Sequence, residues 1–431
     1  MVIKLEYLVV CVGRIRNIVI FRPLGRAFIY CPFWLRSSQE EQNYQRRSAK
    51  KMATTFWALL LLLCFSDFFV RINGLGVGIN YGQIANNLPS PSRVSSLLNS
   101  LNISRVKLYD ADPNVLTAFS NSNVQFIIGL GNEYLQTMND PTKAQTWIQQ
   151  HLQPHLTRTR ISCILVGNEV FASNDTQLRS YLLPAMQSVY GALVNLGLSK
   201  QVYVTTAHSL QILSNSFPPS AGSFRDDLTQ YIDPILGFHS QTKSPFLINA
   251  YPFFAYKDSP DQVSLDYVLF QPNQGIKDPI TDLNYDNMLY AQIDSVYSAM
   301  RALGHSDVEV QISETGWPSK GDPNEVGATV ENAGLYNRNL LKRIEERQGT
   351  PARPSVPIDV YVFALFNENL KPGPSSERNY GLYYPNGNPV LSGNGNFLDH
   401  ICPCCPCHFT LNLKAGKLKF HLFLNITEGS K

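Results

Sequence analysis

Two short stretches of the sequence place a glutamate where it could do chemistry. In "FIIGLGNEYL" and in "CILVGNEVF", an apolar, β-branched segment runs into Gly-Asn-Glu, with Glu133 in the first stretch and Glu169 in the second. A glutamate just past a buried strand lies at the strand end rather than inside a core, so a ligand can reach it. Such a carboxyl group can transfer protons or act as a nucleophile, and the pattern alone does not choose between the two.

Polar residues also follow the other apolar runs of the chain. They are mainly amides, phenols and carboxylates: Asn80, Tyr81, Tyr109, Asp110, Asn132, Glu133, Asn168, Glu169, His208, Tyr251, Glu314, Asn367 and Glu368. Amides and carboxylates bind hydroxyl groups and aromatic faces stack on sugar rings, so this set suits an uncharged, polyhydroxylated ligand. We expect His208 to be a packed, hydrogen-bonded histidine rather than an acid or base.

Four of these residues are glutamates that could form a pair. Glycoside hydrolysis usually needs two carboxyl groups, one to protonate the leaving oxygen and one to act at the anomeric carbon. Glu133, Glu169, Glu314 and Glu368 follow the third, fourth, seventh and eighth apolar runs. All four would lie on the same rim of the fold, so position does not show which two form a catalytic pair. The alternative to a catalytic role is that these glutamates form salt bridges on the rim.

The elements that must position these residues read as repeated βα units. The apolar runs are "LGVGINYG", "RVKLYDA", "VQFIIGLG", "SCILVGNEV", "QVYVTTAHS", "PFLINAYPFF", "VEVQISETG" and "IDVYVFALFNEN". Between them, helical patterns cover Thr142 to His151, Leu178 to Leu196 and Tyr285 to Leu303. Such alternation favours parallel strands buried on both faces, and eight of them predict an α/β fold, a single (β/α)₈ TIM-type barrel. A doubly wound open sheet is the alternative, but "GVGINYG" lacks the G-x-G-x-x-G spacing of a phosphate loop.

Composition sets the class of protein. The 431 residues are 44% hydrophobic and 16% charged with a net charge of +3, which predicts one large core and argues against nucleic-acid binding. Of the 8 cysteines, only Cys163 lies between Arg71 and Asp399, so no disulfide can form within this segment. Cys163 sits in an apolar run and is expected to be a buried, unbridged hydrophobic residue.

Several motifs in the expected order resemble glycoside hydrolase family 17, the plant-type glucan endo-1,3-β-glucosidases. They are "VGNEV" and "ISETGWPS", together with "GINYG", "VKLYD", "NAYPFF", "FALFNENLKPGP" and "ERNYGL", and they cover about residues 75–385. The resemblance implies a retaining double displacement on 1,3-β-glucan in the cell wall, in keeping with plant defence. No cofactor and no metal are implied, because acid catalysis and carboxylate attack suffice.

Carried onto matching positions, the resemblance makes Glu169 the proton donor and Glu314 the nucleophile. Asn168 would bind the sugar 2-hydroxyl, and Glu133 would be a rim or helix N-cap residue. Tyr81, Tyr109, Tyr251, Glu368, Lys371 and Glu377 would contact the substrate or support the nucleophile, with Lys371 balancing charge among the carboxylates. For Tyr109 and Tyr251 the alternative is a purely structural role, and for Glu377 it is a surface ion pair. Trp317, Phe253 and Phe254 are either sugar-stacking surfaces or core residues.

The ends of the chain carry targeting and divergent segments. Residues 1–51 look like an upstream extension, disordered or a misassigned start, and residues 52–74 have the layout of a secretory signal peptide, with an apolar anchor as the alternative. Residues 75–399 would be the catalytic domain, and its last helix is expected beyond Pro389. Residues 400–431 form an atypical tail. Its cysteines, from Cys402 to Cys407, could bind a metal, but an oxidising, extracellular setting favours their oxidation and argues against a zinc site.

Three functions are compatible with this sequence. A secreted, monomeric endo-hydrolase of 1,3-β-glucan without a stable membrane span is the leading hypothesis. A glucan transglycosylase would use the same glycosyl-enzyme, with a sugar hydroxyl in place of water. A glucan-binding protein that has lost catalysis is disfavoured by the presence of both Glu169 and Glu314.

Overall fold

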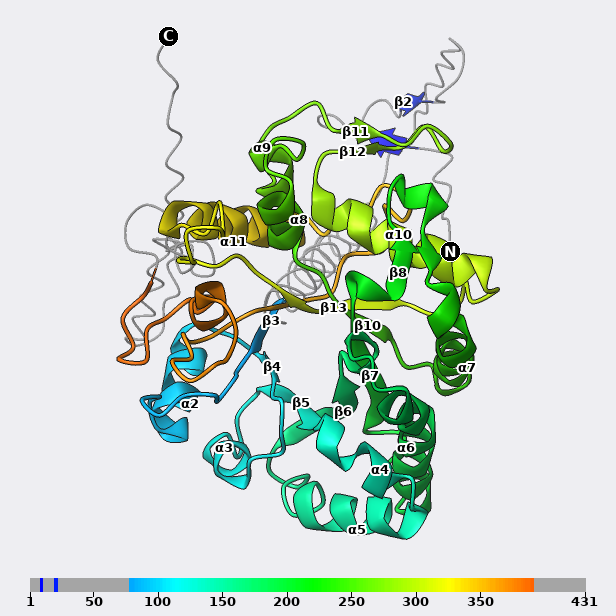
Figure 1. The fold of residues 1–431 in the computed structure, drawn as a ribbon, viewed down its shortest axis with the longest axis vertical. Helices are drawn as coiled ribbons and strands as arrows, with labels where there is room; N and C mark the ends of the chain where they lie inside the picture. Colours follow the sequence, from blue (N-terminus) through cyan, green and yellow to red (C-terminus); the bar gives the residue numbers. More distant parts are fainter. Residues whose placement is uncertain (1–7, 11–18, 22–76, 391–431) are drawn as a thin grey trace, which may run out of the picture. The chain divides into compact units, whose positions relative to one another are not determined.

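The structure is a computed structural model that describes residues 8–10, 19–21 and 77–390 (Figure 1). The predicted signal peptide and the atypical C-terminal tail lie outside the described residues. The chain divides into two units at Asn73 and Gly74, which are described separately. In the first unit, β1 (Leu8–Val10) and β2 (Val19–Phe21) form a short antiparallel pair.

Eight parallel strands of the second unit form a closed barrel, which confirms the predicted fold. The strand order is β10-β13-β14-β3-β4-β5-β6-β7, so neighbours along the chain are also neighbours in space. The strands are β3 (Val77–Asn80), β4 (Arg105–Lys107), β5 (Gln125–Leu130), β6 (Arg160–Asn168), β7 (Tyr203–Ser209), β10 (Phe246–Asn249), β13 (Val310–Thr315) and β14 (Val360–Val362).

Closure of the barrel occurs within these strands. β14 pairs with β3 in parallel, with Val360 opposite Val77 and Val362 opposite Ile79. The ring of backbone hydrogen bonds is therefore complete at Val362, before the divergent tail begins.

Helices follow most strands and lie around the outside of the barrel (Figure 1). The three predicted helices are present as α5, α6 and α10, each within three residues of the expected ends. The helices are α2 (Pro91–Ser100), α3 (Pro113–Ala118), α4 (Leu135–Met138), α5 (Pro141–His151), α6 (Thr176–Asn195), α7 (Asp226–Thr242), α8 (Pro252–Asp258), α9 (Leu265–Val268), α10 (Met288–Ala302) and α11 (Val330–Glu345).

Side-chain caps fix where the long helices begin. Asp140 accepts hydrogen bonds from the first backbone amides of α5, Asp175 from that of Leu178 in α6, and Asn287 from that of Tyr290 in α10. A side-chain oxygen at this position satisfies an amide that has no partner within its own helix. The caps therefore set where each strand-to-helix loop ends.

Shorter elements decorate the barrel. Five 3₁₀ turns and two small antiparallel pairs lie in the loops: η1 (Asn132–Tyr134), η2 (Val170–Ala172), η3 (Leu210–Ile212), η4 (Pro219–Ala221), η5 (Ser375–Arg378), β8 (Leu213–Asn215) with β9 (Ser223–Phe224), and β11 (Ile276–Lys277) with β12 (Asn284–Tyr285). Within the described ranges, no helix has the length and apolar character that a membrane crossing requires.

The core has an outer and an inner layer. Strand residues such as Ile128, Ile164 and Ile248 pack with the helices in one large cluster. Their neighbours in sequence form a second, smaller cluster of strand residues inside the barrel: Ile127, Cys163, Leu165, Ala207, Leu247 and Tyr361. This alternation is what a closed barrel requires, since successive side chains of a strand point to opposite faces. Cys163 is free and fully buried in this inner layer, as expected.

Candidate active site

The carboxyl ends of the strands bring the predicted site residues together at one mouth of the barrel. Glu169 follows β6 directly, and Glu314 is the fifth residue of β13. β7 and β10 lie between these two strands in the ring. The two glutamates are therefore held by a rigid scaffold rather than by long loops, which suits catalytic groups that must keep a fixed geometry.

Glu314 accepts three hydrogen bonds at its carboxylate. Lys107 Nζ and Tyr109 Oη each lie 2.7 Å from Oε1, and Tyr251 Oη lies 2.9 Å from Oε2. Only 6% of Glu314 is exposed, and Lys107 is fully buried. The carboxylate is thus held on both oxygens by side chains from β4, from the residues just after β4, and from those just after β10.

This environment favours the ionised form of Glu314. Burial alone would raise its pKa, but the charge and hydrogen bond of Lys107, with the hydrogen bond of Tyr109, outweigh burial and the pKa lies below its ordinary value. Burial and the negative charge of Glu314 hold the pKa values of Tyr109 and Tyr251 well above normal, so both phenols stay protonated and donate. An ionised, oriented carboxylate of this kind can act as a nucleophile.

Glu169 has the opposite environment. It is half-buried, and burial followed by the negative charge of Glu314 raises its pKa, against the hydrogen bond from Asn249 and the charge of Lys107. Asn249 Nδ2 donates to Glu169 Oε1 at 2.7 Å. The carboxyl group of Glu169 thus accepts a hydrogen bond from an uncharged amide, whereas that of Glu314 accepts from an ammonium group and two phenols. A carboxyl group that keeps its proton can serve as a general acid.

Asn249 links the two halves of the site. Its Oδ1 accepts a short hydrogen bond from Ser313 Oγ, next to Glu314, and this fixes which way the amide faces. Its Nδ2 then points to Glu169 and also lies 3.3 Å from Asn168 Oδ1. One buried amide at the end of β10 therefore ties the strand of one glutamate to the turn that carries the other.

The backbone at Glu169 is in an unusual conformation. Gly167 has φ +69° and Glu169 has φ 54° and ψ 34°, so both adopt left-handed backbone conformations around Asn168. A non-glycine residue in this region costs about 1–3 kcal/mol and persists where the surrounding structure enforces it. The turn directs the chain from β6 into η2, and the backbone amide of Glu169 donates to the carbonyl of Ala207 in β7 at 2.8 Å.

Glu133 does not join the pair of carboxyl groups. It is exposed in η1, and no hydrogen bond or ion pair joins it to Glu169 or Glu314. Its neighbour Asn132 instead pairs with the backbone of Asn168, accepting from its N–H at 2.8 Å and donating to its carbonyl at 3.0 Å. The two Gly-Asn-Glu stretches are therefore in contact, but through the asparagines.

Glu368, Lys371 and Glu377 lie near Glu314, but no hydrogen bond or ion pair joins them to it. Glu368 is 4% exposed, accepts from the amide of Ile84 at 2.8 Å, and has a pKa raised chiefly by burial. Lys371 lies 3.2 Å from Glu377 Oε2 and 4.2 Å from the centre of the Phe363 ring. Lys371 does lower the pKa values of Glu169 and Glu314, but the cation that is hydrogen-bonded to Glu314 is Lys107.

The expected aromatic contacts divide into buried and accessible rings. Tyr81, Trp317 and Phe253 are at most 1% exposed and pack in the main core, whereas Phe254 is 37% exposed. Tyr81 packs edge-on against Phe366, and burial raises its pKa to about 12. Of the three candidate stacking rings, Trp317 and Phe253 are therefore core residues, and Phe254 is the one with substantial exposure. A substrate contact by Tyr81 stays a prediction.

His208 is packed as expected but lacks the expected hydrogen bonds. Neither ring nitrogen has a partner among the described residues, and the ring stacks between Phe171 and Phe246 at centroid distances of 5.3 and 4.7 Å. Burial lowers its pKa to about 3, so it stays neutral. The expected hydrogen bonding is therefore not found: Phe171 and Phe246 contact the ring faces, and no described residue places a polar atom within hydrogen-bond distance of the ring nitrogens.

Two residues that contact the glutamates, Lys107 and Asn249, were not predicted from the sequence. Lys107 was overlooked because it lies within the apolar run "RVKLYDA", and Asn249 because "NAYPFF" drew attention to Tyr251. The usable signal was strand periodicity: Lys107 follows Val106, which packs outward, so its side chain must point into the barrel. A buried lysine there needs a carboxylate partner.

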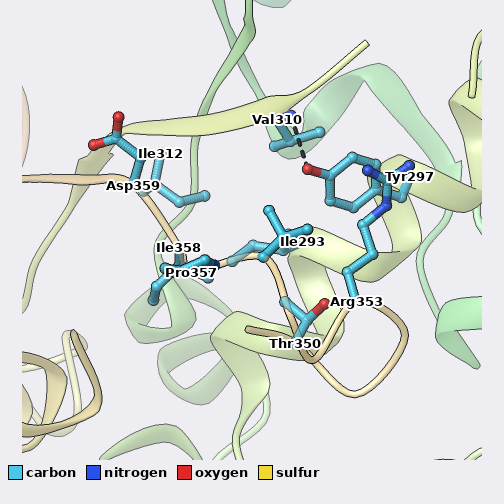
Figure 2. A pocket seen from close by; sticks show the side chains of 10 residues that line it. Ile293, Tyr297, Val310, Ile312, Thr350, Arg353, Pro357, Ile358 and Asp359 are labelled. Carbon is cyan, nitrogen blue, oxygen red and sulfur yellow. Dashed lines mark hydrogen bonds between the residues drawn. The ribbon is translucent and has the colours of Figure 1, made fainter. Parts of the chain in front are cut away.

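Hollows at the amino ends of the strands are separate from this site. One cavity of about 20 Å³ lies where β13 and β14 begin, against α10, and Tyr297 Oη there accepts from the Val310 amide at 3.0 Å (Figure 2). A larger hollow of about 480 Å³ shares Tyr297 and Val310. Both are at the opposite end of the strands from the glutamates. Among residues 77–390, no group of three or more His, Cys, Asp or Glu side chains is arranged to hold a metal ion.

Comparisons with known proteins identify a family and several relatives of this chain. The model of the family described as Glycosyl hydrolases family 17 matches residues 77–393. Glucan endo-1,3-beta-glucosidase 14 of Arabidopsis thaliana is 70% identical over 339 residues, which is 78% of this chain and 86% of that protein. Glucan endo-1,3-beta-glucosidase 11 of the same plant is 58% identical over 337 residues, covering 78% and 79% of the two chains.

Two solved structures are similar in fold and sequence. CJP38, a beta-1,3-glucanase and allergen of Cryptomeria japonica pollen, has a TM-score of 0.70 and 40% identity, covering 73% of this chain and 98% of that one. A structure from a study of two plant beta-glucan endohydrolases with distinct substrate specificities has a TM-score of 0.68 and 35% identity over the same shares.

Proposed function

Since the chain belongs to glycosyl hydrolase family 17 and is an O-glycosyl hydrolase, we propose that it cleaves internal linkages of 1,3-β-glucan with retention of anomeric configuration. Glu314 is the nucleophile and Glu169 the general acid and base. The observation that carries this assignment is the difference between their partners: Glu314 accepts from Lys107 and two phenols, whereas Glu169 accepts from the Asn249 amide. The partners of Glu314 lower its pKa, and burial raises that of Glu169.

In the first step, a Glu314 oxygen attacks the anomeric carbon while Glu169 gives its proton to the glycosidic oxygen. The bond between the sugar and the leaving chain breaks, and a covalent glycosyl-enzyme forms on Glu314. Tyr109 and Tyr251 stay protonated and hold the attacking carboxylate, and Lys107 compensates its charge until it is consumed.

In the second step, Glu169 acts as the base. As a carboxylate it takes a proton from water, whose oxygen attacks the same carbon and releases Glu314. Two inversions give net retention. The pathway needs the two carboxyl groups about 5–5.5 Å apart, which leaves no room for a water between nucleophile and sugar.

Asn168, Tyr81, Glu368, Lys371 and Glu377 belong to the substrate side of this proposal. The amide of Asn168 is near enough to Asn249 to be oriented by it, which supports a contact with the sugar 2-hydroxyl. Lys371 and Glu377 form an ion pair, and the charge of Lys371 lowers the pKa values of Glu169 and Glu314.

Reducing-sugar release from laminarin-type glucan by the purified protein tests the activity. The proposal expects soluble oligosaccharides from the start of the reaction and a first product of β-configuration by proton NMR. A protein that binds the glucan without cleaving it would contradict hydrolysis. Longer oligosaccharides formed at high substrate concentration would show that sugar hydroxyls compete with water for the same intermediate.

We also propose that the protein is secreted to the cell wall as a monomer. The support for secretion is the signal layout that begins at Met52, with its basic residues, its apolar run from Phe56 to Phe65 and the small residues that lead to Gly74. The N-terminal sequence of the exported protein should then begin near Gly74, and an exported chain that kept Met1 would contradict the assignment.

A further inference from the structure

The turn that carries Glu169 is held by a side chain from the neighbouring strand end. β5 ends at Leu130, which pairs with Val166, whereas β6 continues to Asn168. On its other side β6 still has a partner, since Asn168 pairs with Ala207 of β7 and the amide of Glu169 donates to the Ala207 carbonyl. On the β5 side, the backbone of Asn168 has no strand to pair with.

The side chain of Asn132 takes the place of the missing strand partner of Asn168. Its side-chain amide accepts from Asn168 N–H at 2.8 Å and donates to Asn168 C=O at 3.0 Å. A primary amide has one acceptor oxygen and donor hydrogens on the adjacent nitrogen, so it can replace the two hydrogen bonds that a neighbouring strand would make to Asn168. These are the last backbone groups before Glu169.

The space around this contact is closed to larger side chains. A Cβ at Gly167 would lie 3.2 Å from Asn132 Oδ1, 2.9 Å from a Val170 methyl and 3.3 Å from a Leu182 methyl, at a φ of +69°. The glycine before Asn168 therefore has two reasons to be a glycine. It reaches a left-handed conformation at low cost, and it leaves room for the incoming amide.

We infer that Asn132 is a positioning residue for the acid-base carboxyl of Glu169, acting through the backbone of Asn168. It fixes the left-handed turn and thereby the direction of the Glu169 side chain, without touching the reacting atoms. This inference rests on the proposed function, because it needs Glu169 to be the proton donor. It also gives the first Gly-Asn-Glu stretch a role that its glutamate does not have.

The consequence is a specific kinetic defect when Asn132 is removed. A displaced acid slows departure of a sugar leaving group, which needs a proton, and spares a leaving group that needs none. With Asn132→Ala, kcat/KM on laminarin should fall about 10- to 100-fold, the order of effect expected for a misplacement near 1 Å. On a 2,4-dinitrophenyl β-laminarioligosaccharide, kcat/KM should change less than about 3-fold.

Turnover of the activated substrate should also become sensitive to azide. Since a displaced base activates water poorly, the glycosyl-enzyme accumulates, and azide, which needs no base, should raise kcat and appear as a β-glycosyl azide. Asn195→Ala is the matched control, because Asn195 is an exposed amide at the end of α6. That variant should match the wild type with both substrates and with azide.

Asn132→Asp is a second, more conservative variant that tests the inference if Asn132→Ala does not fold. Its carboxylate keeps an acceptor for the Asn168 amide but loses the donor to the Asn168 carbonyl, so it should show the same leaving-group selectivity with an intact thermal transition. The inference would be overturned if a folded variant, Asn132→Ala or Asn132→Asp, lost kcat/KM equally on the two substrates or kept full activity with both. An inactive wild type would instead overturn the proposed function itself, so the two failures are distinguishable.

Discussion

Glu169 and Glu314 have the same side chain but opposite pKa shifts because their neighbours differ. The decisive neighbour of Glu314 is Lys107, which is fully buried and lies 2.7 Å from it. Glu169 has an uncharged amide at the same distance. A buried ammonium group favours an adjacent carboxylate strongly because the surroundings screen little of the interaction. Lys107 is therefore the largest single reason why the pKa of Glu314 is lowered although the residue is buried.

Lys107→Met should therefore change the pH profile in a defined direction. Lys107 lowers the pKa of Glu314, so its loss raises that pKa, and the acid limb of kcat/KM should move to higher pH. At the optimum, kcat/KM on laminarin should fall by about 10²-fold, as for loss of other preorganised charges in active sites. The measurement is kcat/KM against pH for both proteins, below their melting temperatures.

Lys243→Met is the control for this comparison. The side chain of Lys243 is 74% exposed and pairs with Asp307 at the surface, so its removal should leave both limbs of the profile in place. If Lys107→Met also kept the wild-type acid limb, Lys107 would not be what keeps Glu314 ionised.

Sequence reasoning identifies residues at strand ends better than residues inside strands. Tyr109, Tyr251 and Glu314 were candidates because they follow apolar runs, and the family resemblance selected them. The structure brings all three together. Lys107 was missed because a lysine in an apolar strand pattern reads as an irregularity. Its partner is 207 residues away in the chain, and local patterns carry no information on that contact.

The β6-to-η2 turn shows what one strand end contributes to the site. The left-handed conformation of Glu169 could not be predicted, because a glutamate has no intrinsic preference for it and the cost is met by long-range contacts. Gly167 was the only local sign of this turn in the sequence. Its conformation and its crowded surroundings are both visible only in the folded chain.

Gly167→Ala should lose both stability and activity. At φ +69° an added Cβ costs about 1–2 kcal/mol, and here it would also meet a Val170 methyl at 2.9 Å. Gly197→Ala is a matched control with φ +71° and no heavy atom within 4 Å of the added Cβ. Urea unfolding should show a larger loss for Gly167→Ala, and activity on laminarin should fall for that variant alone. Equal losses in the two variants would mean that the surroundings of Gly167 contribute nothing.

Closure of the barrel is supported by a contact between β4 and the segment that leads into β14. Arg105 of β4 reaches across β3, with its guanidinium 2.5 Å from Asp359, just before β14, and 4.9 Å from the centre of the Tyr361 ring. One side chain therefore contacts the segment that meets β3 at the seam. The sequence predicted eight strands and their order, but not this contact, because the register at a seam is set by packing across the whole ring.

Arg105→Ala should destabilise the protein through this seam. The variant loses the ion pair, the contact with Tyr361 and the packing of the side-chain stem, so we expect a loss of about 1–3 kcal/mol in the free energy of unfolding. Lys243→Ala, which removes a surface ion pair with Asp307, should cost less than about 0.5 kcal/mol. Urea denaturation of both variants measures the difference, and equal effects would show that Arg105 is not important for closure.

The double displacement itself is tested most directly by the configuration of azide products from two variants. With an activated aryl β-laminarioligosaccharide, Glu314→Ala should be inactive until azide fills the vacated space, and should then give the inverted α-glycosyl azide. Glu169→Ala should still form the glycosyl-enzyme from this substrate, and azide should then give the β-glycosyl azide of retained configuration. Glu133→Ala should behave like the wild type. An inverted first product from the wild type, or acid-deficient behaviour in Glu133→Ala in place of Glu169→Ala, would contradict the account.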